Sequence, residues 1–399
     1  MTTAYLVSGR RTPVGRYGGA LSSVRPDDLA ALTIRAVIED AGIDPAAVDE
    51  VILGNANGAG EENRNVARLA WLLAGYADTV PGITVNRLCA SGMSAIALAT
   101  AMVESGQADI VVAGGVESMS RAPWVMEKPS SAFARPGEVF DTSIGWRFVN
   151  PVFAAQEKTT FSMPETAEEV ARVCGVSRAD ADAFAAESQR RAAAAIEAGN
   201  FEPEIVPVEI TDRKGNVTVV DTDEGPRAGT TTEILAKLRP VVAGGEVVTA
   251  GNSSSLNDGA SAILVVSEAA VEKYGLKARA KVVANANAGL APEVMGLGPV
   301  PATQKVLQRA GWNIGGVDAV ELNEAFATQS LACIRQLDLD PTKVNAWGGA
   351  IALGHPLGSS GSRITITLLN RLEQEGGQRG IATLCIGVGQ GSAIAIERV

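Results

Sequence analysis

Apolar residues along the chain gather in short continuous runs that alternate with longer stretches of helical spacing. Short runs stand at 51–53, 110–112, 262–267 and 381–384. Short apolar runs bounded by turn residues are typical of buried strands, whereas apolar positions that recur every three to four residues are typical of helices. The pattern therefore predicts an α/β protein.

The same pattern occurs twice along the chain. Residues 41–53 and 310–322 share alanine, glycine, valine, aspartate, valine and leucine at matching offsets. Each copy predicts a helix end, a loop and a buried strand. Downstream, a Val-Asn pair followed by a Ser-Gly pair opens a helical run at 85–92 and again at 344–361. Because both pairs of repeated segments occur in the same order and at similar spacing, we expect two duplicated α/β halves.

The residues between the two repeats differ from both of them. Loops containing proline, serine and tryptophan come first, and an alanine-rich stretch at 178–198 then predicts a helix. Ser177 is suited to cap the start of this helix, and Gly199 is suited to end it. We expect this region to form an excursion that covers one face of the core.

The first half resumes after this excursion, because strand-like runs return at 246–250 and 262–267. At 399 residues the chain exceeds one ordinary core, so several packed units are expected. The predicted units are an N-terminal half of residues 1–120 plus 244–272, a loop domain of residues 121–243, and a C-terminal half of residues 273–399.

Composition narrows the class of protein. Hydrophobic residues make up 46% and charged residues 20%, which is typical of a soluble globular protein. The formal net charge of −11 argues against nucleic acid as a partner, because such a partner needs a basic face. The beginning of the chain shows no secretory signal, and no apolar run is long enough to span a membrane. We therefore expect a cytoplasmic protein without a membrane partner.

The four cysteines, Cys89, Cys174, Cys333 and Cys385, include no close pair and no C-x-x-C motif. Disulfides are not expected in a reducing compartment. The chain has one histidine and no ligand spacing for zinc, so we expect no metal site.

Cys89 stands between a strand-like run and a helical run that begins near Ser91. A thiol at a helix N-terminus can have its thiolate stabilised by the helix dipole and by unpaired N–H groups. The alternative is a small buried hydrophobic residue, and the two interpretations are about equally supported by the local sequence.

His355 lies in a Gly-His-Pro-Leu-Gly run inside residues 348–358, which the second repeat has and the first lacks. If the halves pack about a pseudo-dyad, this inserted loop can lean over Cys89. A lone histidine is more often a structural residue. Yet if Cys89 needs a base of ordinary pKa, His355 is the only histidine that can supply it.

Three further segments carry polar groups with two possible roles. Cys385 opens a glycine-rich run at 385–391 that looks like a dinucleotide fingerprint, but an alternating strand pattern follows it instead of the required helix. Its glycines suit a close approach of backbone N–H groups to a ligand.

Asn323 can cap a helix or contribute to an oxyanion hole. The polar loop at 250–260 can turn the chain or bind a ligand.

Taken together these segments resemble the thiolase family along essentially the whole chain. The runs that carry the resemblance are 86–92, 113–120, 323–327, 348–361 and 385–391. The resemblance implies a duplicated fold, an α-β-α-β-α sandwich of two pseudo-dyad-related halves with an inserted loop domain on the coenzyme A side. It also implies reversible, CoA-dependent cleavage of a 3-oxoacyl-CoA, and a homodimer or homotetramer.

The resemblance assigns roles residue by residue. It implies that Cys89 is the nucleophile, His355 its base, Cys385 the second acid/base and Asn323 the residue that positions a catalytic water. The N–H groups of Cys89 and Gly387 would form one oxyanion hole. Coenzyme A or acetyl-CoA would be a substrate, not a permanently bound cofactor, and its binding residues would be Ser254, Arg227 and Met163.

Within the family, the runs at 60–68, 120–123, 141–151 and 162–168 are similar to the 3-oxoadipyl-CoA thiolases, which act in aromatic-compound breakdown. Three residues bear on the acyl chain. Ser162 stands where acetoacetyl-CoA thiolases tend to carry histidine. Trp347 replaces a usual asparagine close to the His355 loop, and Val242 lies where many relatives carry phenylalanine near the acyl pocket. The alternatives are an acetoacetyl-CoA or general 3-ketoacyl-CoA thiolase of fatty acid metabolism.

Two other classes compete with this interpretation. A decarboxylating ketoacyl synthase shares the duplicated fold, but it would not need Cys385 and commonly uses a second histidine or an asparagine. A thiolase-like module that binds coenzyme A or lipid without catalysis would not need all four catalytic positions filled. One histidine with two suitably placed cysteines favours the thiolase.

Overall fold

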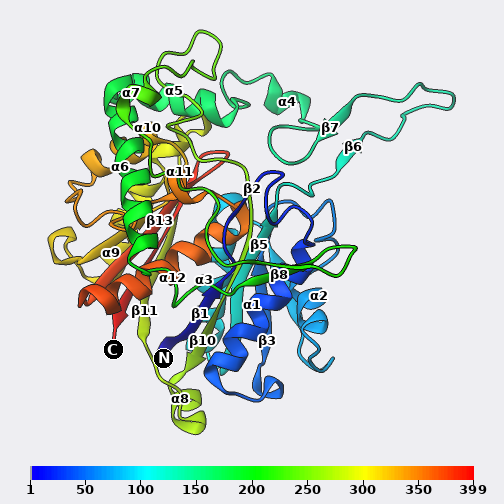
Figure 1. Cartoon of the computed structure of the whole chain (residues 1–399), viewed down its shortest axis with the longest axis vertical. Helices are drawn as coiled ribbons and strands as arrows, with labels where there is room; N and C mark the ends of the chain where they lie inside the picture. Colours follow the sequence, from blue (N-terminus) through cyan, green and yellow to red (C-terminus); the bar gives the residue numbers. More distant parts are fainter. Residues whose placement is uncertain (1) are drawn as a thin grey trace.

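The computed structural model describes residues 2–399, and Figure 1 shows the arrangement of its helices and strands. The strands are β1 (Ala4–Arg11), β2 (Gly15–Arg16), β3 (Glu50–Gly54), β4 (Gly82–Val85), β5 (Ile110–Ser118), β6 (Trp124–Met126), β7 (Val139–Asp141), β8 (Val208–Thr211), β9 (Val217–Val220), β10 (Asn257–Ser267), β11 (Ala280–Gly289), β12 (Ala319–Leu322), β13 (Arg379–Ile386) and β14 (Gln390–Arg398). The α-helices are α1 (Pro26–Ala41), α2 (Val66–Leu73), α3 (Ser91–Glu104), α4 (Pro151–Ala154), α5 (Met163–Cys174), α6 (Arg178–Glu197), α7 (Thr232–Leu235), α8 (Glu268–Tyr274), α9 (Pro299–Ala310), α10 (Ala327–Gln336), α11 (Ala350–Leu353) and α12 (Leu357–Glu375). Four short 3-10 helices complete the set: η1 (Pro45–Ala47), η2 (Leu88–Ala90), η3 (Pro292–Leu297) and η4 (Ile314–Gly316).

The main sheet consists of two similar half-sheets joined along one edge. The strand order is β12-β13-β14-β11-β1-β10-β5-β3-β4. The join between β1 and β11 is short, because only Tyr5 and Leu6 pair with Lys281 and Ala280. On either side of it the pairing repeats: β3 is parallel to β5 as β12 is parallel to β13, and β10 is antiparallel to β5 as β14 is antiparallel to β13.

The predicted sequence repeat is therefore a structural repeat. In both copies a helix ends at a glycine in the left-handed region, Gly42 with a φ of 64° and Gly311 with a φ of 67°. A 3-10 turn and a buried strand follow in each copy, η1 and β3 in the first half and η4 and β12 in the second. Left-handed backbone at a helix C-terminus strongly favours glycine, which explains why this residue recurs in both copies.

Five layers result from this duplication. Helices α3 and α12 lie in the centre, and one apolar core joins them to both half-sheets. Helices α1 and α2 cover the outer face of the first half-sheet, while α9 and α10 cover that of the second (Figure 1). The α-β-α-β-α sandwich implied by the sequence resemblance is confirmed.

Glycines allow the two central helices to pack with almost no space between their backbones. An added Cβ on Gly361 of α12 would lie 2.4 Å from the backbone nitrogen of Met93, and one on Gly92 of α3 would lie 2.8 Å from the carbonyl oxygen of Gly358. No side chain fits at such distances. The close approach brings the start of α12, and the loop before it, against the start of α3.

The segment between the repeats contains the predicted helix as α6, where the Ser177 hydroxyl accepts a hydrogen bond from Asp180 N and Gly199 has a φ of 73°. The strand predicted at 246–250 is wrong: that run contributes only an isolated bridge between Pro240 and Thr249. The backbone N–H groups of Val247 and Val248 donate to the Glu168 carboxylate instead of to a neighbouring strand, so this strand-like run does not join a sheet.

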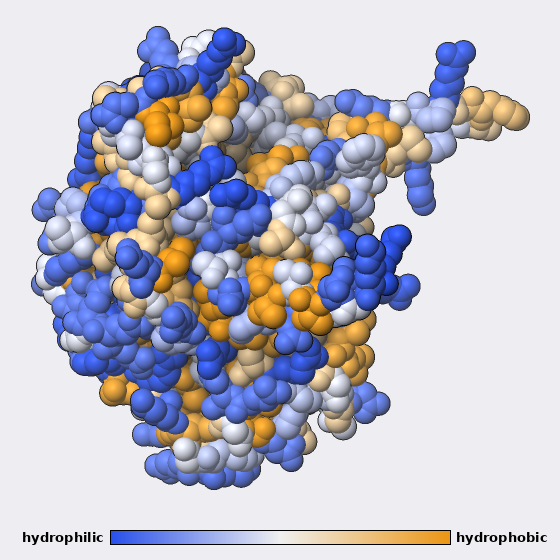
Figure 2. Space-filling model, in the orientation of Figure 1, coloured by the Kyte–Doolittle hydropathy of each residue, from blue (hydrophilic) through white to orange (hydrophobic). Residues whose placement is uncertain are grey.

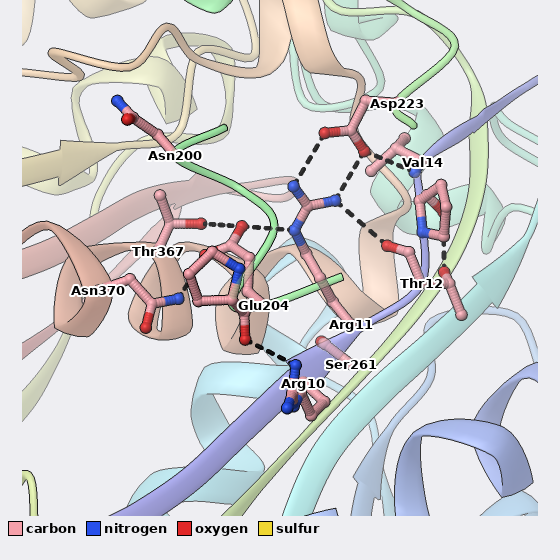
Figure 3. A network of polar contacts seen from close by, with 12 residues as sticks. Arg10, Arg11, Thr12, Val14, Asn200, Glu204, Asp223, Ser261, Thr367 and Asn370 are labelled. Carbon is pink, nitrogen blue, oxygen red and sulfur yellow. Dashed lines mark hydrogen bonds and ion pairs between the residues drawn. The ribbon is translucent and has the colours of Figure 1, made fainter. Parts of the chain in front are cut away.

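A buried ionic network ties this segment to both halves (Figure 3). Arg11 of β1 donates to Glu204 at 2.6 Å and to both carboxylate oxygens of Asp223 at 2.6 and 2.8 Å. Glu204 also accepts hydrogen bonds from Thr367 and Asn370 of α12. Buried charges are tolerated when they are paired and fully hydrogen-bonded, as here. The network thus fixes α12 relative to β1 and to the connecting segment.

Candidate active site

One cavity of about 260 Å³ brings together residues from both halves and from the segment between them. Most of its wall is apolar. Its lining residues are Cys89, Met119, Ile144, Met163, Pro164, Val241, Ala250, Ser253, Ser254, Ser255, Leu256, Met295, Ala325, Phe326, His355, Leu357 and Cys385. Two cysteines and the single histidine therefore face the same enclosed space, although 296 positions separate the first cysteine from the second.

Cys89 occupies a sharp turn between β4 and α3. Leu88, the residue before it, has a φ of 47°. A leucine rarely adopts this left-handed region, and such strain is typical of functional turns. The turn is held by its own polar groups: Ser91 Oγ donates to Leu88 O and accepts from Arg87 N. The arrangement presents the Cys89 thiol to the cavity at the start of α3.

Burial raises the pKa of the Cys89 thiol to about 11. The backbone N–H groups of Gly387 and of Cys89 itself hydrogen-bond to the sulfur and act in the opposite direction, toward a lower pKa. The expected stabilisation of the thiolate by nearby N–H groups is therefore present, but desolvation by the apolar wall is the larger effect. Cys89 consequently needs a base to react at neutral pH.

His355 lies in the loop between α11 and α12, and its hydrogen bonds define its tautomer. Ser360 Oγ is 2.6 Å from His355 Nδ1 and 2.9 Å from the carbonyl oxygen of Pro356, to which it donates. A hydroxyl has one hydrogen, so Nδ1 must carry the proton that joins it to Ser360. Nε2 is then left with its lone pair free to accept a proton.

Burial also keeps the His355 ring neutral, because it lowers the pKa to about 3, with a further contribution from the buried Arg363 guanidinium. Arg363 is on α12, three residues beyond Ser360. A neutral imidazole with a free Nε2 is the form that can take a proton from a thiol. The resting pair at neutral pH is thus a thiol and an imidazole, not an ion pair.

Asn323 follows β12 and does not cap a helix, because α10 begins only at Ala327. Its Nδ2 lies 3.4 Å from His355 Nε2. Its Oδ1 is buried and has no hydrogen-bond partner within residues 2–399. A buried acceptor without a partner is costly, and a water or ligand atom commonly satisfies it. The helix-cap interpretation is therefore wrong, and the side chain faces the cavity residue His355.

Cys385 is at the end of β13, and burial raises the pKa of its thiol well above the usual value, with Cys89 as the next contribution. The turn after it contains Gly387 and Val388, and the latter has a φ of 63° in the region that favours glycine. β14 then runs from Gln390 toward the C-terminus as a strand. The rejection of a dinucleotide fingerprint is confirmed, because strand and not helix follows the glycines.

The three residues expected at coenzyme A differ in their positions. Ser254 and Met163 line the cavity. Ser254 N donates to Ala325 O, and its hydroxyl makes no hydrogen bond within residues 2–399. Arg227 is exposed and lies outside the lining set, in the segment that leads to α7. Leu235 of α7 packs over Gly251, next to the serine loop.

None of the three residues that bear on the acyl chain, Ser162, Trp347 and Val242, lines this cavity. Trp347 is buried in a separate core, where its ring packs edge-on against Phe201 at 5.7 Å. Val242 is also absent from the lining, whereas its neighbour Val241 is present. Trp347 thus replaces a polar residue by filling space between α6 and α11, away from the thiols.

Several supporting residues could not be identified as such from the sequence. Ser360 orients the His355 ring, and Asn257 Oδ1 accepts a hydrogen bond from His355 N at 2.9 Å. Glu117 is buried at the end of β5, accepts hydrogen bonds from Asn55, Ala56, Asn57 and Gly358, and has a pKa raised to about 7 by burial. It joins the first half to the loop that carries His355. A serine five residues after the histidine is the one signal available in sequence.

Replacement of His355 by asparagine tests the base. We expect alkylation of Cys89 by iodoacetamide at pH 7 to slow by about tenfold or more, because the buried thiol loses its proton acceptor. The difference should narrow as the pH approaches 11, the pKa of the Cys89 thiol, since hydroxide then removes the proton unaided. Mass spectrometry gives the rate, with Cys174 as internal reference. Equal rates and equal pH dependence in variant and wild type would contradict the assignment.

Within residues 2–399 no group of His, Cys, Asp and Glu side chains is arranged to hold a metal ion. All four cysteines are free thiols. None of the helices over the same residues is both long and apolar enough to cross a membrane. The polar groups that line the cavity are two thiols, an imidazole and the hydroxyls of the serine loop.

Comparison with known proteins matches this arrangement to one family. Residues 4–269 match the thiolase N-terminal domain and residues 276–398 the thiolase C-terminal domain. The chain is 56% identical over 398 residues to a beta-ketoadipyl-CoA thiolase of Pseudomonas aeruginosa, covering 99% of both chains, and 52% identical over 402 residues to a 3-oxoadipyl-CoA/3-oxo-5,6-dehydrosuberyl-CoA thiolase of Escherichia coli, covering 100% of both. It also superimposes on an acetyl-CoA acetyltransferase of Bacillus anthracis with a TM-score of 0.94 at 40% identity, covering 100% of this chain and 99% of the other. With its duplicated halves and its paired thiols in one cavity, the chain is an acyltransferase that belongs to the thiolase family.

Proposed function

We propose that this thiolase cleaves 3-oxoadipyl-CoA with coenzyme A to give acetyl-CoA and a shortened acyl-CoA, through an acyl group carried on Cys89. The observation that carries the proposal is the cavity that Cys89, His355 and Cys385 line together. Thiolases as a family catalyse this CoA-dependent cleavage of 3-oxoacyl-CoA. The acyl chain is inferred from the relatives named for beta-ketoadipyl-CoA and 3-oxoadipyl-CoA, which match over their full length.

In the first step His355 Nε2 takes the proton of the Cys89 thiol, and the sulfur attacks the 3-oxo carbon of the substrate. The bond between carbons 2 and 3 then breaks, and its electron pair passes to the enolate of acetyl-CoA. The acyl group remains on Cys89 as a thioester. The free Nε2 of a neutral ring, fixed by Ser360, supports His355 as the base.

Cys385 supplies the proton that the enolate needs. Its pKa is raised well above the usual value, so the thiol is protonated at neutral pH and can act as an acid. Once it has given its proton, it can accept another from the thiol of incoming coenzyme A. The coenzyme A thiolate then attacks the acyl carbon, the bond from that carbon to the Cys89 sulfur breaks, and the Cys89 thiolate takes back the proton held by His355, so that the shortened acyl-CoA is released.

Charge develops at two different oxygen atoms in this reaction, so two sets of donors are needed. The N–H groups of Cys89 and Gly387, which already hydrogen-bond to the Cys89 sulfur, would stabilise the tetrahedral adduct. His355 and a water held by Asn323 would stabilise the enolate. The unpartnered, buried Oδ1 of Asn323 supports a water at this point.

Coenzyme A would enter beside the serine loop, under the cover of residues 121–243. Ser254 and Met163 line the cavity there, and the hydroxyl of Ser254 is free to meet the pantetheine part. Arg227 would contact the nucleotide end outside the cavity, where a positive charge is useful because the chain as a whole carries −11. Coenzyme A is in this view a substrate and not a resident cofactor.

Residues on the surface support a homodimer or homotetramer. Apolar side chains stay exposed on α2, on the edge strand β4 and on the hairpin of β6 and β7, where monomeric proteins rarely gather them. Figure 1 shows this hairpin projecting far from the body, and Figure 2 shows apolar atoms at its tip. The exposed residues are Leu69, Leu72, Leu73, Ile83, Trp124, Met126, Phe133 and Val139. A cytoplasmic location and a role in aromatic-compound or fatty acid breakdown stay predictions from the sequence.

The acyl chain is tested by comparing kcat/KM for coenzyme A-dependent cleavage of 3-oxoadipyl-CoA, acetoacetyl-CoA and a medium-chain 3-oxoacyl-CoA. We expect 3-oxoadipyl-CoA to be preferred by about tenfold or more, an effect equivalent to one well-placed charged contact. Preference for either of the other substrates would leave the thiolase chemistry intact and overturn the proposed acyl chain. Absence of cleavage of all three would favour a thiolase-like binding module.

A further inference from the structure

The proposed substrate carries a carboxylate at the far end of its acyl chain. No positively charged side chain lines the cavity to bind it. None of the seventeen lining residues is a lysine or an arginine. A carboxylate brought into an apolar site without a partner loses its hydration at high cost. A cation immediately beyond the apolar wall is therefore needed to make such a substrate acceptable.

Arg147 lies beyond the wall, three residues after the lining residue Ile144, in the segment between β7 and α4 (Figure 1). Its side chain is half-buried, and its one hydrogen bond within residues 2–399 is a long one, 3.4 Å from Nη2 to Asn57 Oδ1. It has no ion-pair partner among the same residues. Most of the donors of a partly desolvated guanidinium are thus left without an acceptor, although arginine normally finds carboxylates at such positions.

The segment that carries Arg147 is fastened to the body close to its own side chain. Asn57 Nδ2 donates to both the carbonyl oxygen and the hydroxyl of Thr142 at 3.0 Å, and Thr142 is buried. Asn57 therefore donates from its amide nitrogen to Thr142 at the start of this loop, and it accepts from Arg147 with its amide oxygen. The guanidinium is held beside Asn57, not swung out into solvent.

Asn57 in turn lies next to the nucleophile turn. Its neighbour Ala56 accepts a hydrogen bond from Asn86 Nδ2 at 3.0 Å, and Asn86 Oδ1 accepts one from Leu88 N at 2.8 Å. Two residues on from Asn86 the chain reaches Leu88, and Cys89 follows directly. Hydrogen bonds and neighbouring residues thus lead from the Arg147 guanidinium, through Asn57 and Asn86, to the turn that carries Cys89.

Glu117, the nearest buried carboxylate, does not neutralise this guanidinium. Its two oxygens already accept hydrogen bonds from Ala56 N, Asn57 N, Asn55 Nδ2 and Gly358 N. Gly358 follows the lining residue Leu357, so Glu117 links Asn57 to a residue next to the cavity wall. Because its acceptor positions are filled from the backbone, Arg147 stays available for another carboxylate.

We propose that Arg147 binds the terminal carboxylate of the acyl chain and so determines the preference for a dicarboxylic 3-oxoacyl-CoA. The inference rests on the proposed 3-oxoadipyl-CoA activity. It names the residue that would bind the terminal carboxylate, the group that distinguishes this substrate. Once the acyl group is on Cys89, three carbon–carbon bonds separate the thioester carbon from the carboxylate, a reach of roughly 4 Å. In this proposal the Arg147 guanidinium turns from its single long hydrogen bond with Asn57 toward the acyl chain, and its planar fork binds both carboxylate oxygens.

The test combines a change in the protein with a change in the substrate. Wild type, Arg147→Gln and Arg135→Gln are compared for kcat/KM with 3-oxoadipyl-CoA, its terminal amide and acetoacetyl-CoA. Arg135 is exposed in the hairpin between β6 and β7, so its replacement removes the same charge away from the cavity. We expect Arg147→Gln to lower kcat/KM for 3-oxoadipyl-CoA by about 10- to 100-fold and to leave the amide and acetoacetyl-CoA within about threefold. Arg135→Gln should change none of the three.

Each other outcome identifies a different error. If Arg147→Gln loses activity on all three substrates equally, Arg147 serves coenzyme A binding or the fold, and the inference is overturned. If Arg147→Gln still prefers 3-oxoadipyl-CoA over its amide, the inference about Arg147 is also overturned. The proposed function would then be unaffected. If wild type itself does not distinguish the acid from the amide, the proposed acyl chain is wrong, and the inference is overturned with it. Arg147→Lys should restore part of the preference, since it keeps the charge but loses the fork.

Discussion

Cys89→Ala is expected to abolish cleavage and synthesis alike, with a loss in kcat on the order of 10⁴-fold or more. The reason is that the acyl group has no other carrier. Cys385 is the second thiol in the cavity, but it lies at the end of β13, and burial raises its pKa well above the usual value. A protonated, buried thiol is a poor nucleophile, so it cannot replace Cys89. Steady-state assays in both directions measure the loss.

Cys174→Ala is the matched control, because Cys174 is a partly exposed thiol outside the cavity lining. Its removal should leave kcat within about twofold of wild type. Intact protein mass after exposure to acetyl-CoA gives an independent reading: one acetyl group should be present on wild type and on Cys174→Ala, and none on Cys89→Ala. Turnover near wild type by Cys89→Ala would show that another group carries the acyl chain.

Cys385→Ala should separate the two half-reactions. We expect acetyl transfer from acetyl-CoA to Cys89 to persist at a reduced rate, because coenzyme A can leave as a thiolate without a proton, while carbon–carbon cleavage falls by about 10²- to 10⁴-fold, the usual contribution of a general acid or base. Cys89 keeps its base and its N–H donors in this variant, whereas the enolate of acetyl-CoA loses its proton source. Mass spectrometry follows the acetyl-enzyme, and coenzyme A-dependent loss of acetoacetyl-CoA follows the cleavage.

Cys385→Ser provides the comparison at nearly constant size. A hydroxyl is a much weaker acid than a thiol, so the serine variant should be as defective in cleavage as the alanine variant if the proton matters, and near wild type if only the volume matters. Loss of acetyl transfer with retained cleavage would reverse the proposed division of roles between the two cysteines.

Burial in the apolar cavity has different consequences for the two thiols. Burial raises the pKa of both thiols, which keeps Cys385 protonated as an acid and leaves Cys89 dependent on a base. The same burial lowers the pKa of His355 to about 3 and keeps that base neutral. One apolar cavity thus prepares an acid, a nucleophile and a base for a pH at which none of them carries a charge.

Much of the fold could be predicted from the sequence because it rests on local signals that occur twice. The glycine that ends a helix, the Val-Asn pair and the apolar strands recur at 41–53 and 310–322, and a duplicated α/β fold follows from them. The helix at α6 was predictable from its cap and its terminal glycine. The run at 246–250 was misjudged, since whether a strand-like run becomes a strand depends on a free neighbouring edge.

The sequence by itself determined which chemical groups are available: one histidine, cysteines at helix and strand ends, and glycines where backbones approach closely. Only the tertiary structure decided what those groups do. Asn323 fits a helix cap by its spacing, but α10 starts four residues later and the Asn323 amide instead contacts His355. Arg147 is one of many arginines until the fold brings its guanidinium to Asn57 and leaves it without an ion-pair partner within residues 2–399. The physical reason is that pKa values and pairing depend on the groups that the fold packs around a side chain, and these come from distant parts of the chain.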